Sequence, residues 1–322
     1  MDGIEPATSK RLKGFIPYTI RNEFRVDFLN RTVRAGIARL DEDKFSRLSV
    51  RAVVADELVN KVEHVEARFG LGNGYSLVYI GYNSPSRELT EQKRAACDER
   101  LGQAQEERAV SISERLRSVV INRTENETGT YALEGGYMVR LVVDENSRRA
   151  LLSQHESELI SFLGAFQYNG EEVRGAILNS SNVVSVAYRE TGAGRELIGV
   201  SICEMNEVPL DNGRGVIRLA EFTDTYVKEG HRHNNIHFGM QVGMLYFMLS
   251  RHPDYSLFSE SNNENGAVIN AAKINRDFGG LLRNHVEIEG NMKSLQVMYH
   301  GGASREAALE AFSSYSAFEN LF

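Results

Sequence analysis

Apolar spacing predicts a helix-rich first part of the chain. Apolar residues recur three and four positions apart in Phe15–Leu40 and Arg47–Phe69, which predicts two helices. Tyr75–Tyr82 is apolar and rich in aromatic and β-branched residues, which predicts a strand. The charged segment Glu91–Val120 predicts a long helix or helix pair. The polar, turn-rich segment Ile121–Gly136 predicts a linker.

Beyond this linker, short apolar runs alternate with helical patterns. Strands are predicted at Tyr137–Val143, Asn182–Tyr188, Glu196–Met205, Val216–Tyr226, Tyr255–Glu260, Arg283–Ile288 and Ser294–Tyr299. Helices are predicted at Ser147–Leu163, Glu171–Leu178, Ile236–Arg251 and Glu264–Arg276. A meander followed by a crossover helix implies an α/β (α+β) fold with a mixed sheet and helices on both faces. We therefore expect a helix-rich α/β domain over 1–130 and a second domain over 131–322.

Composition narrows the class of protein. Apolar residues make up 42% and charged residues 25% of the 322 residues, as in soluble globular proteins. No apolar run is long enough to span a bilayer, and the N-terminus has no signal-peptide core. Two distant cysteines, Cys97 and Cys203, favour a reducing compartment over a disulfide framework. We expect a cytoplasmic protein that does not bind membranes.

The segment from Glu221 to Met240 is the most informative part of the sequence. The predicted strand Val216–Tyr226 breaks into a loop, and the apolar helix Ile236–Arg251 follows. A loop that feeds a helix N-terminus binds phosphates, because unpaired backbone N–H groups and the helix dipole point at the anion. This segment therefore predicts an anion-binding turn.

Several motifs in order resemble the GNAT acyltransferase superfamily, especially β-lysine N-acetyltransferase-like members. The family's central motif runs roughly V-x-P-E-Y-R-G-x-G-x-G, and Val227 and Arg232 fit it within the segment Val227–His237. AEFTD precedes this loop at Ala220–Asp224, and GGLLRNHVEIEG at Gly279–Gly290 leads into SLQVMYH. The likeness covers roughly residues 137–300. It implies a GNAT-like, mostly antiparallel mixed sheet.

The resemblance also implies a donor site. In this family the loop and helix N-terminus hold the pyrophosphate of coenzyme A, and the end of the preceding strand lines the pantetheine arm. Carried over, the arm would meet Tyr226 and Val227, with Asn263 either holding it or serving as a helix cap. The phosphate side would comprise Arg232, His233, Asn234, Asn235, Ile236, His237 and Phe238, mainly through backbone N–H groups.

Two departures from the family pattern leave the donor open. Asn235 and His237 stand where the family has glycines, although asparagine tolerates positive φ better than most residues. The predicted helix Glu264–Arg276 has no tyrosine to protonate a departing thiolate. The donor is therefore acetyl-CoA or a related thioester, or alternatively an acyl carrier protein or an aminoacyl-tRNA. Loss of activity, with a regulatory role, is a third outcome.

Acyl transfer to an amine needs a base and a way to expel the leaving group. Glu221 and Asp224 lie on the central strand, and each is either a base or amine anchor, or the partner of a structural cation. They are three apart, so a regular strand would point them to opposite faces, whereas a bulge could bring both together. Tyr299 is a candidate acid or a packing residue. His233 and His237 have helical metal spacing but no evident third ligand, so no metal is expected.

Charge suggests further partners. The net charge is −7, yet residues 8–51 hold 11 basic and 5 acidic groups. Such a segment is either a solvated helix face or a surface for an acidic carrier protein or tRNA. We thus expect an N-acyltransferase that acts on the amine of a small molecule, in a biosynthetic pathway if the donor is carrier-bound or tRNA-bound. A homodimer is a further possibility to test.

Overall fold

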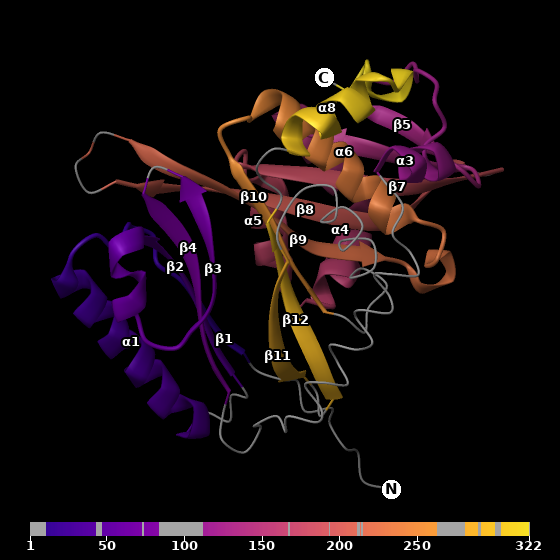
Figure 1. Cartoon of the computed structure of the whole chain (residues 1–322). Coiled ribbons are helices and arrows are strands. Elements are labelled where there is room, and N and C mark those ends of the chain that lie inside the picture. The colour runs from indigo at the N-terminus through magenta and orange to yellow at the C-terminus, as the bar shows by residue number, and fades with distance from the viewer. Residues whose placement is uncertain are drawn as a thin grey trace, which may run out of the picture.

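The chain builds two β-sheets, one of four strands and one of eight, as seen in a computed structural model (Figure 1). The residues that the structure describes are 11–42, 47–72, 74–83, 112–166, 168–192, 194–210, 213, 215–262, 281–288, 291–299 and 304–321.

The small sheet comes from the N-terminal part. Its strands are β1 (Arg11–Phe15), β2 (Arg47–Ala55), β3 (Val65–Gly72) and β4 (Tyr75–Asn83), in the order β1-β2-β4-β3. The 3-10 helix η1 (Asp56–Lys61) joins β2 to β3, and helix α1 (Glu23–Glu42) covers one face of the sheet. Val26, Leu29 and Val33 of α1 are buried there.

The prediction of a helix over Arg47–Phe69 is wrong, because this segment forms β2, η1 and β3. β2 is buried on both faces: Val50, Ala52 and Val54 pack toward α1, whereas Val53 packs in a different core. An apolar strand of this kind lacks the alternation that marks a half-exposed strand. The other predicted helix of this part begins at Glu23 instead of Phe15.

The large sheet has the order β11-β12-β10-β9-β8-β7-β6-β5. Its strands are β5 (Thr130–Leu133), β6 (Tyr137–Val142), β7 (Asn182–Thr191), β8 (Gly194–Pro209), β9 (Val216–Val227), β10 (Ser256–Asn262), β11 (Leu281–Ile288) and β12 (Asn291–Tyr299). Only the β9–β10 pair is parallel among its described pairs. The expected mixed, mostly antiparallel sheet is confirmed.

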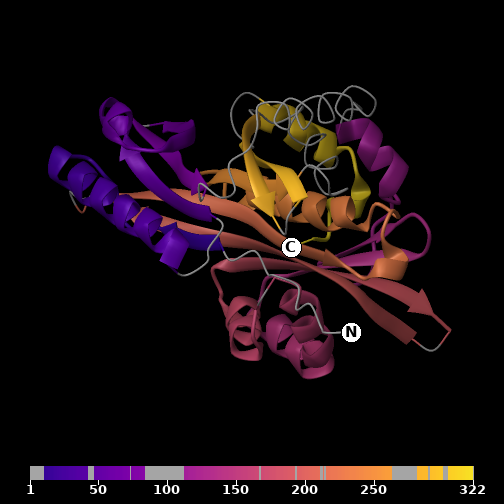
Figure 2. The same ribbon diagram turned by 90° about the horizontal axis from the view of Figure 1, so that it is seen from below.

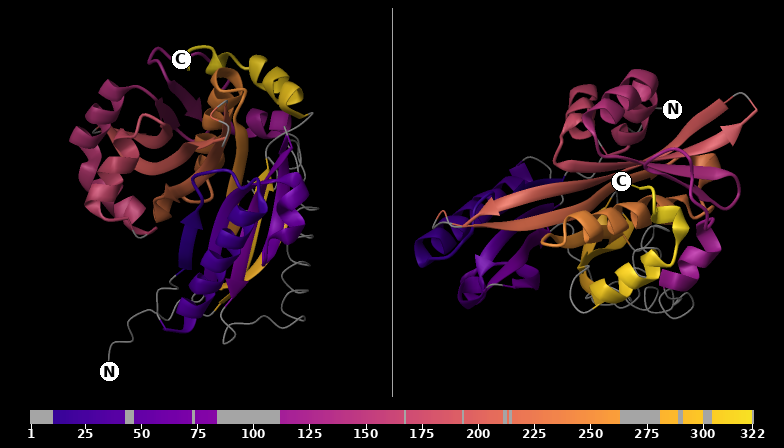
Figure 3. Two further views of the ribbon diagram at one scale, coloured as in Figure 1. Left: turned by 90° about the vertical axis from the view of Figure 1, so that its left-hand side faces the viewer. Right: turned by 90° about the horizontal axis from the view of Figure 1, so that it is seen from above.

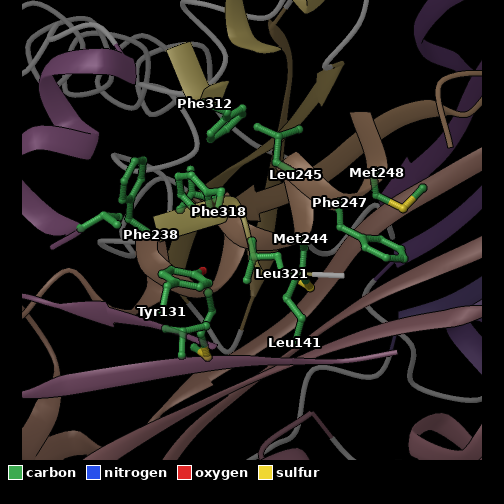
Figure 4. Packing of buried hydrophobic residues seen from close by; sticks show 14 of the residues in the cluster. Tyr131, Leu141, Phe238, Met244, Leu245, Phe247, Met248, Phe312, Phe318 and Leu321 are labelled. Atoms are coloured by element: carbon green, nitrogen blue, oxygen red, sulfur yellow. The ribbon is translucent and has the colours of Figure 1, made fainter. Parts of the chain in front are cut away.

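Helices cover both faces of the large sheet, as expected (Figures 2 and 3). Helices α4 (Glu145–Gly164) and α5 (Gly170–Leu178) pack on one face, and α6 (Ile236–Arg251) packs on the other with α3 (Ile112–Val119) and α8 (Ser304–Ser313). Figure 4 shows Met244 of α6 in the same apolar cluster as Tyr131 and Phe318. This core makes α6 a rigid support for the loop that precedes it.

Most predicted elements after residue 130 are confirmed, with four additions. β5 lies inside the predicted linker Ile121–Gly136, the 3-10 turn η3 (Glu229–His231) follows β9, and α8 and the 3-10 helix η4 (Ser316–Phe318) follow β12. The predicted helix Glu264–Arg276 and most of Glu91–Val120 lie outside the described residues. A domain boundary at residue 130 stays a prediction, although α3, which precedes it, packs in the core of the large sheet.

A further hydrophobic cluster joins the two sheets. Val53, Phe69, Leu77 and Tyr79 of the small sheet pack against Val208, Leu219 and Phe258 of the large one. Val208 lies on the same face of β8 as Val200 and Ile202, which contact the α4–α5 side. The small sheet and the α4–α5 pair therefore share one face of the large sheet.

None of the helices in the described ranges is both long and apolar enough to span a bilayer.

Candidate functional site

The parallel strands β9 and β10 part in the middle of the large sheet. They pair from Leu219 opposite Ser256 to Phe222 opposite Ser259. Beyond that point β9 stays with β8 as far as Val227, whereas β10 stays with β12. The carboxyl ends of two parallel strands thus diverge, an arrangement in which open α/β sheets commonly bind ligands.

β9 has a bulge where the strands part. Ser201 of β8 lies opposite Thr225 of β9, and Cys203 lies opposite Phe222, so β9 has one residue more than β8 between these pairs. An extra residue reverses the alternation of side chains beyond it. Glu221 and Asp224, three apart in sequence, therefore lie on the same face. The bulge considered from the sequence is present.

Glu221 is a buried carboxylate with a cationic partner. Its side chain is 8% exposed and forms an ion pair with Arg51 of β2 in the small sheet. Across the sheet it lies opposite Glu204 of β8 on one side and Phe258 of β10 on the other. A buried carboxylate of this kind needs such a partner to remain charged.

Asp224 is held by a tyrosine from the other side of the site. The Tyr168 hydroxyl, from the connection between α4 and α5, donates a hydrogen bond of 2.7 Å to Asp224 Oδ2. Burial raises the pKa of Tyr168 most, followed by the charge and hydrogen bond of Asp224 and by the charges of Glu204 and Glu221. One carboxylate, that of Asp224, therefore contacts the Tyr168 hydroxyl, and those of Glu204 and Glu221 lie near enough to act on it electrostatically.

The end of β9 is fixed by aromatic packing and a backbone contact. The Tyr226 ring stacks on Phe162 of α4, with ring centroids 4.7 Å apart. Val227 packs toward the core under α6. Arg232 Nε donates to the Val227 carbonyl over 3.0 Å, and its guanidinium lies 5.9 Å from the Tyr226 ring centroid. In this structure the Arg232 side chain thus braces the strand end.

The loop after β9 turns into the N-terminus of α6 through two residues with left-handed backbone conformations. A 3-10 turn, η3 (Glu229–His231), follows the strand, and His233 and Asn235 then adopt left-handed φ values of 69° and 60°. Asn235, one of the two residues in place of the glycines that the sequence resemblance implies, is the N-cap of α6. The first turn of α6 presents backbone N–H groups that no carbonyl of the helix can reach. The backbone therefore fits a phosphate group.

Side chains from this turn point in different directions. Ile236 and Phe238 are 1% exposed and belong to the core, so only their backbone could face a ligand. Asn234 Nδ2 donates to the carbonyls of His231 and Arg232. The Nδ1 atom of His237 is shielded from solvent and has no hydrogen-bond partner in the described structure. Burial lowers the pKa of His237 to about 4, so the ring is neutral near pH 7.

Two predicted site residues lie at or beyond the limits of the description. Tyr299 ends β12 opposite Phe258, which in turn lies opposite Glu221. Two strand spacings, roughly 10 Å, therefore separate the backbones of Tyr299 and Glu221. The Tyr299 side chain and all of Asn263 lie outside the described structure. The roles assigned to the site residues from the sequence stay predictions.

Sequence reasoning missed three members of the site: Arg51, Tyr168 and Glu204. The predicted hairpin of β7 and β8 could have suggested Glu204, because the length of the hairpin fixes which β8 residues lie at the centre of the sheet. Arg51 and Glu221 are 170 residues apart, and no local pattern connects them. Among the described residues, no group of three or more histidine, cysteine, aspartate or glutamate side chains is arranged to hold a metal ion.

Comparison with known proteins finds similarity only at the level of structure. No family model and no curated protein matches the sequence. Arabidopsis thaliana NAA60 in complex with acetyl-CoA is 18% identical, with a TM-score of 0.36 over 51% of this chain and 99% of that one. The ribosomal-protein-S5-alanine acetyltransferase of Vibrio fischeri is 13% identical, with a TM-score of 0.34 over 53% and 96% of the two chains. A putative phosphinothricin N-acetyltransferase is 15% identical, with a TM-score of 0.33 over 51% and 98%.

Proposed function

We propose that this protein is an N-acyltransferase that moves an acetyl or other acyl group from a coenzyme A-type thioester to the amine of a small molecule. One observation carries the proposal: β9 parts from β10 beyond Phe222, bulges between Phe222 and Thr225, and then leads through a short loop to the N-terminus of α6. A donor site and a base would thereby lie on a single strand.

The donor side is argued from the backbone. Beyond Phe222 the edge of β9 that faced β10 no longer pairs with it, so a pantetheine arm could hydrogen-bond there as an extra strand. The turn from Arg232 to Phe238 would receive the phosphates on N–H groups at the start of α6. When bound, the thioester supplies an activated carbonyl.

The acceptor side is argued from charge. Asp224 contacts the Tyr168 hydroxyl, and Glu204 and Glu221 lie near enough to act on it electrostatically. A group of carboxylates of this kind attracts a protonated amine. Glu221 or Asp224 would take a proton from the amine, whose nitrogen then attacks the thioester carbon. The new C–N bond forms as the C–S bond breaks, and the thiolate leaves and takes up a proton. Tyr299 is the candidate acid for that last step.

Binding and turnover test this proposal together. We expect coenzyme A to bind in isothermal titration calorimetry, and acetyl-CoA to acetylate members of a panel of small amines, detected by mass spectrometry. Asp224→Asn and Glu221→Gln should lower kcat/KM by roughly 10²- to 10⁴-fold. The exposed Glu134 of the β5–β6 turn offers a matched control, and Glu134→Gln should leave kcat/KM unchanged. Equal activity in all four proteins would contradict the assigned roles.

One feature supports a second candidate, an acyltransferase whose donor is a loaded acyl carrier protein or an aminoacyl-tRNA. His237 occupies the first turn of α6, where an imidazole takes more room than glycine beside a coenzyme A pyrophosphate. A carrier-bound or tRNA-bound donor presents different phosphate geometry. Transfer from such donors, without binding of coenzyme A, would favour this candidate. Absence of transfer from every donor class would favour a regulatory protein without activity.

A further inference from the structure

Arg51 brings the N-terminal sheet into the candidate site. It lies on β2 and forms its ion pair with Glu221, which lies on β9 of the other sheet. Its side chain is 23% exposed, and that of Glu221 is 8% exposed, so neither group is fully solvated. Ion pairs between exposed groups contribute little, whereas loss of one partner from a buried pair leaves an uncompensated charge.

Aromatic rings fix the position of the Arg51 guanidinium. It lies 6.0 Å from the ring centroid of Phe15 on β1 and 5.8 Å from that of Phe258 on β10. Phe258 is also the register partner of Glu221. The cation is therefore held between the two sheets, directly beside the strand pair that parts.

Packing around the ion pair makes this contact a fixed feature of the interface. Val53, two residues after Arg51 on β2, lies on the same face of the strand and packs in the cluster that joins the sheets. Leu219, two residues before Glu221 on β9, packs in that same cluster. The strands that carry the two charges are thus held together by apolar contacts next to the ion pair.

The surroundings of Glu221 oppose its negative charge. Glu204 of β8 lies opposite it, and Asp224 follows it on the same face. Tyr168 stays protonated, because burial and these carboxylates raise its pKa, and so it adds no charge. The neighbour on β10, Phe258, is apolar. Arg51 therefore offsets the repulsion of the Glu221 carboxylate by Glu204 and Asp224, and it offsets the cost of burying that carboxylate.

We propose that Arg51 is a positioning residue, through which the N-terminal sheet keeps Glu221 ionised and oriented on the acceptor side of the site. This inference rests on the proposed function, in which Glu221 is the base or the anchor of the amine. It makes the small sheet a functional part of the site, since the part of the chain after residue 130 alone would lack Arg51.

The test compares Arg51→Gln and Arg51→Lys with the full-length wild type. The protonation of Glu221 is followed by NMR as the pH is varied, in protein with ¹³C-labelled glutamate carboxyl groups. The Glu221 signal is identified by its loss in Glu221→Gln. This measurement does not depend on turnover. We expect the Glu221 midpoint, and the acid limb of the kcat/KM profile, to move up by about one pH unit or more in Arg51→Gln. Arg51→Lys retains the charge and should shift both by much less.

The control is Arg34, which pairs with Glu63 at the surface. Arg34→Gln should leave both the titration and the rate profile unchanged. A lowered melting temperature for Arg51→Gln without any shift of the Glu221 titration would overturn the inference and leave Arg51 with a structural role only. If Arg51→Gln does not fold, Arg51→Met takes its place, because it also removes the positive charge. An unchanged Glu221 midpoint and an unchanged acid limb in Arg51→Met would overturn the inference equally. A shifted titration in a protein that transfers no acyl group would support the ion pair and refute the proposed function.

Discussion

The Tyr168 hydroxyl donates a hydrogen bond of 2.7 Å to Asp224 Oδ2. This contact links the connection between α4 and α5 to the bulge of β9. Because burial and the neighbouring carboxylates raise the pKa of Tyr168, its hydroxyl stays protonated and keeps donating near neutral pH. Asp224 thus has a fixed orientation at the point where β9 leaves β10.

Tyr168→Phe should therefore remove the hydrogen bond that orients Asp224 and leave the Asp224 carboxylate itself in the site. The variant loses one hydrogen bond to a charged group, worth about 1.5 kcal/mol in unfolding free energy. Urea denaturation followed by circular dichroism measures this loss, and kcat/KM should fall as well. Tyr18→Phe is the control, because the Tyr18 ring packs against the hydrophobic cluster between α1 and the small sheet, beneath the guanidinium of Arg25. Equal stability of Tyr168→Phe and wild type would rule out a structural contribution from this bond.

His237 predicts an acid-sensitive stability. Burial lowers its pKa from 6.5 to about 4, so between these values the unfolded chain binds a proton that the folded chain does not. The folding free energy that depends on a neutral His237 is thus fully present above about pH 6.5, and it is lost as the pH falls toward 4. Between pH 7.5 and 4.5, wild type should lose about 1–3 kcal/mol more unfolding free energy than His237→Gln.

A second histidine of the same loop provides the control for this measurement. His233 is exposed and has a left-handed φ of 69°, which asparagine also tolerates. His233→Asn should retain the wild-type slope of stability against pH. If His237→Gln shows that same slope, His237 is not the group responsible.

Gly243 is required where α6 crosses β5. A Cβ atom there would lie 2.3 Å from the Tyr131 hydroxyl oxygen, and Tyr131 is fully buried with its hydroxyl bonded to the Gly239 carbonyl. Gly243→Ala should therefore lower the unfolding free energy by about 1–3 kcal/mol. Gly175 of α5 has no atom within 4 Å of such a Cβ, so Gly175→Ala should raise it by up to about 1 kcal/mol. Differential scanning calorimetry distinguishes the two, and a Gly243→Ala variant as stable as wild type would contradict the packing.

Asn235 should tolerate glycine and reject β-branched residues. Its φ of 60° lies in the left-handed region, which is costly for side chains other than those of glycine, asparagine and aspartate. Asn235→Gly should keep both the melting temperature and the affinity for coenzyme A. Asn235→Val should lower the unfolding free energy by about 1–2 kcal/mol and weaken binding. Undiminished affinity in Asn235→Val would show that the turn does not form the donor site.

Local patterns were sufficient for most strands of the large sheet and the helices that cover it, but for only one strand, β4, of the small sheet. The run Val216–Tyr226 and the helix Ile236–Arg251 are separated by a clear polar loop, and both are confirmed. β2 was mistaken for helix because its two faces contact two different cores. β1 is a short strand with a polar sequence, RLKGF, and it gains its structure by pairing with β2.

The chemistry of the site depends on contacts that no sequence window contains. Glu221 and Asp224 could be selected as costly carboxylates on an apolar strand. Their common face depends on a bulge, which is set by the pairing of β9 with β8. Arg51 and Tyr168 approach from other elements, and only tertiary packing brings them to these carboxylates.

The most direct measurement is a crystal structure of the protein with bound coenzyme A. The account predicts density for the pantetheine arm along β9 from Thr223 to Val227, with its thiol near Asp224 and its pyrophosphate on the backbone from Arg232 to Phe238. Coenzyme A bound elsewhere on the protein, with this part of β9 and the start of α6 uncontacted, would contradict it.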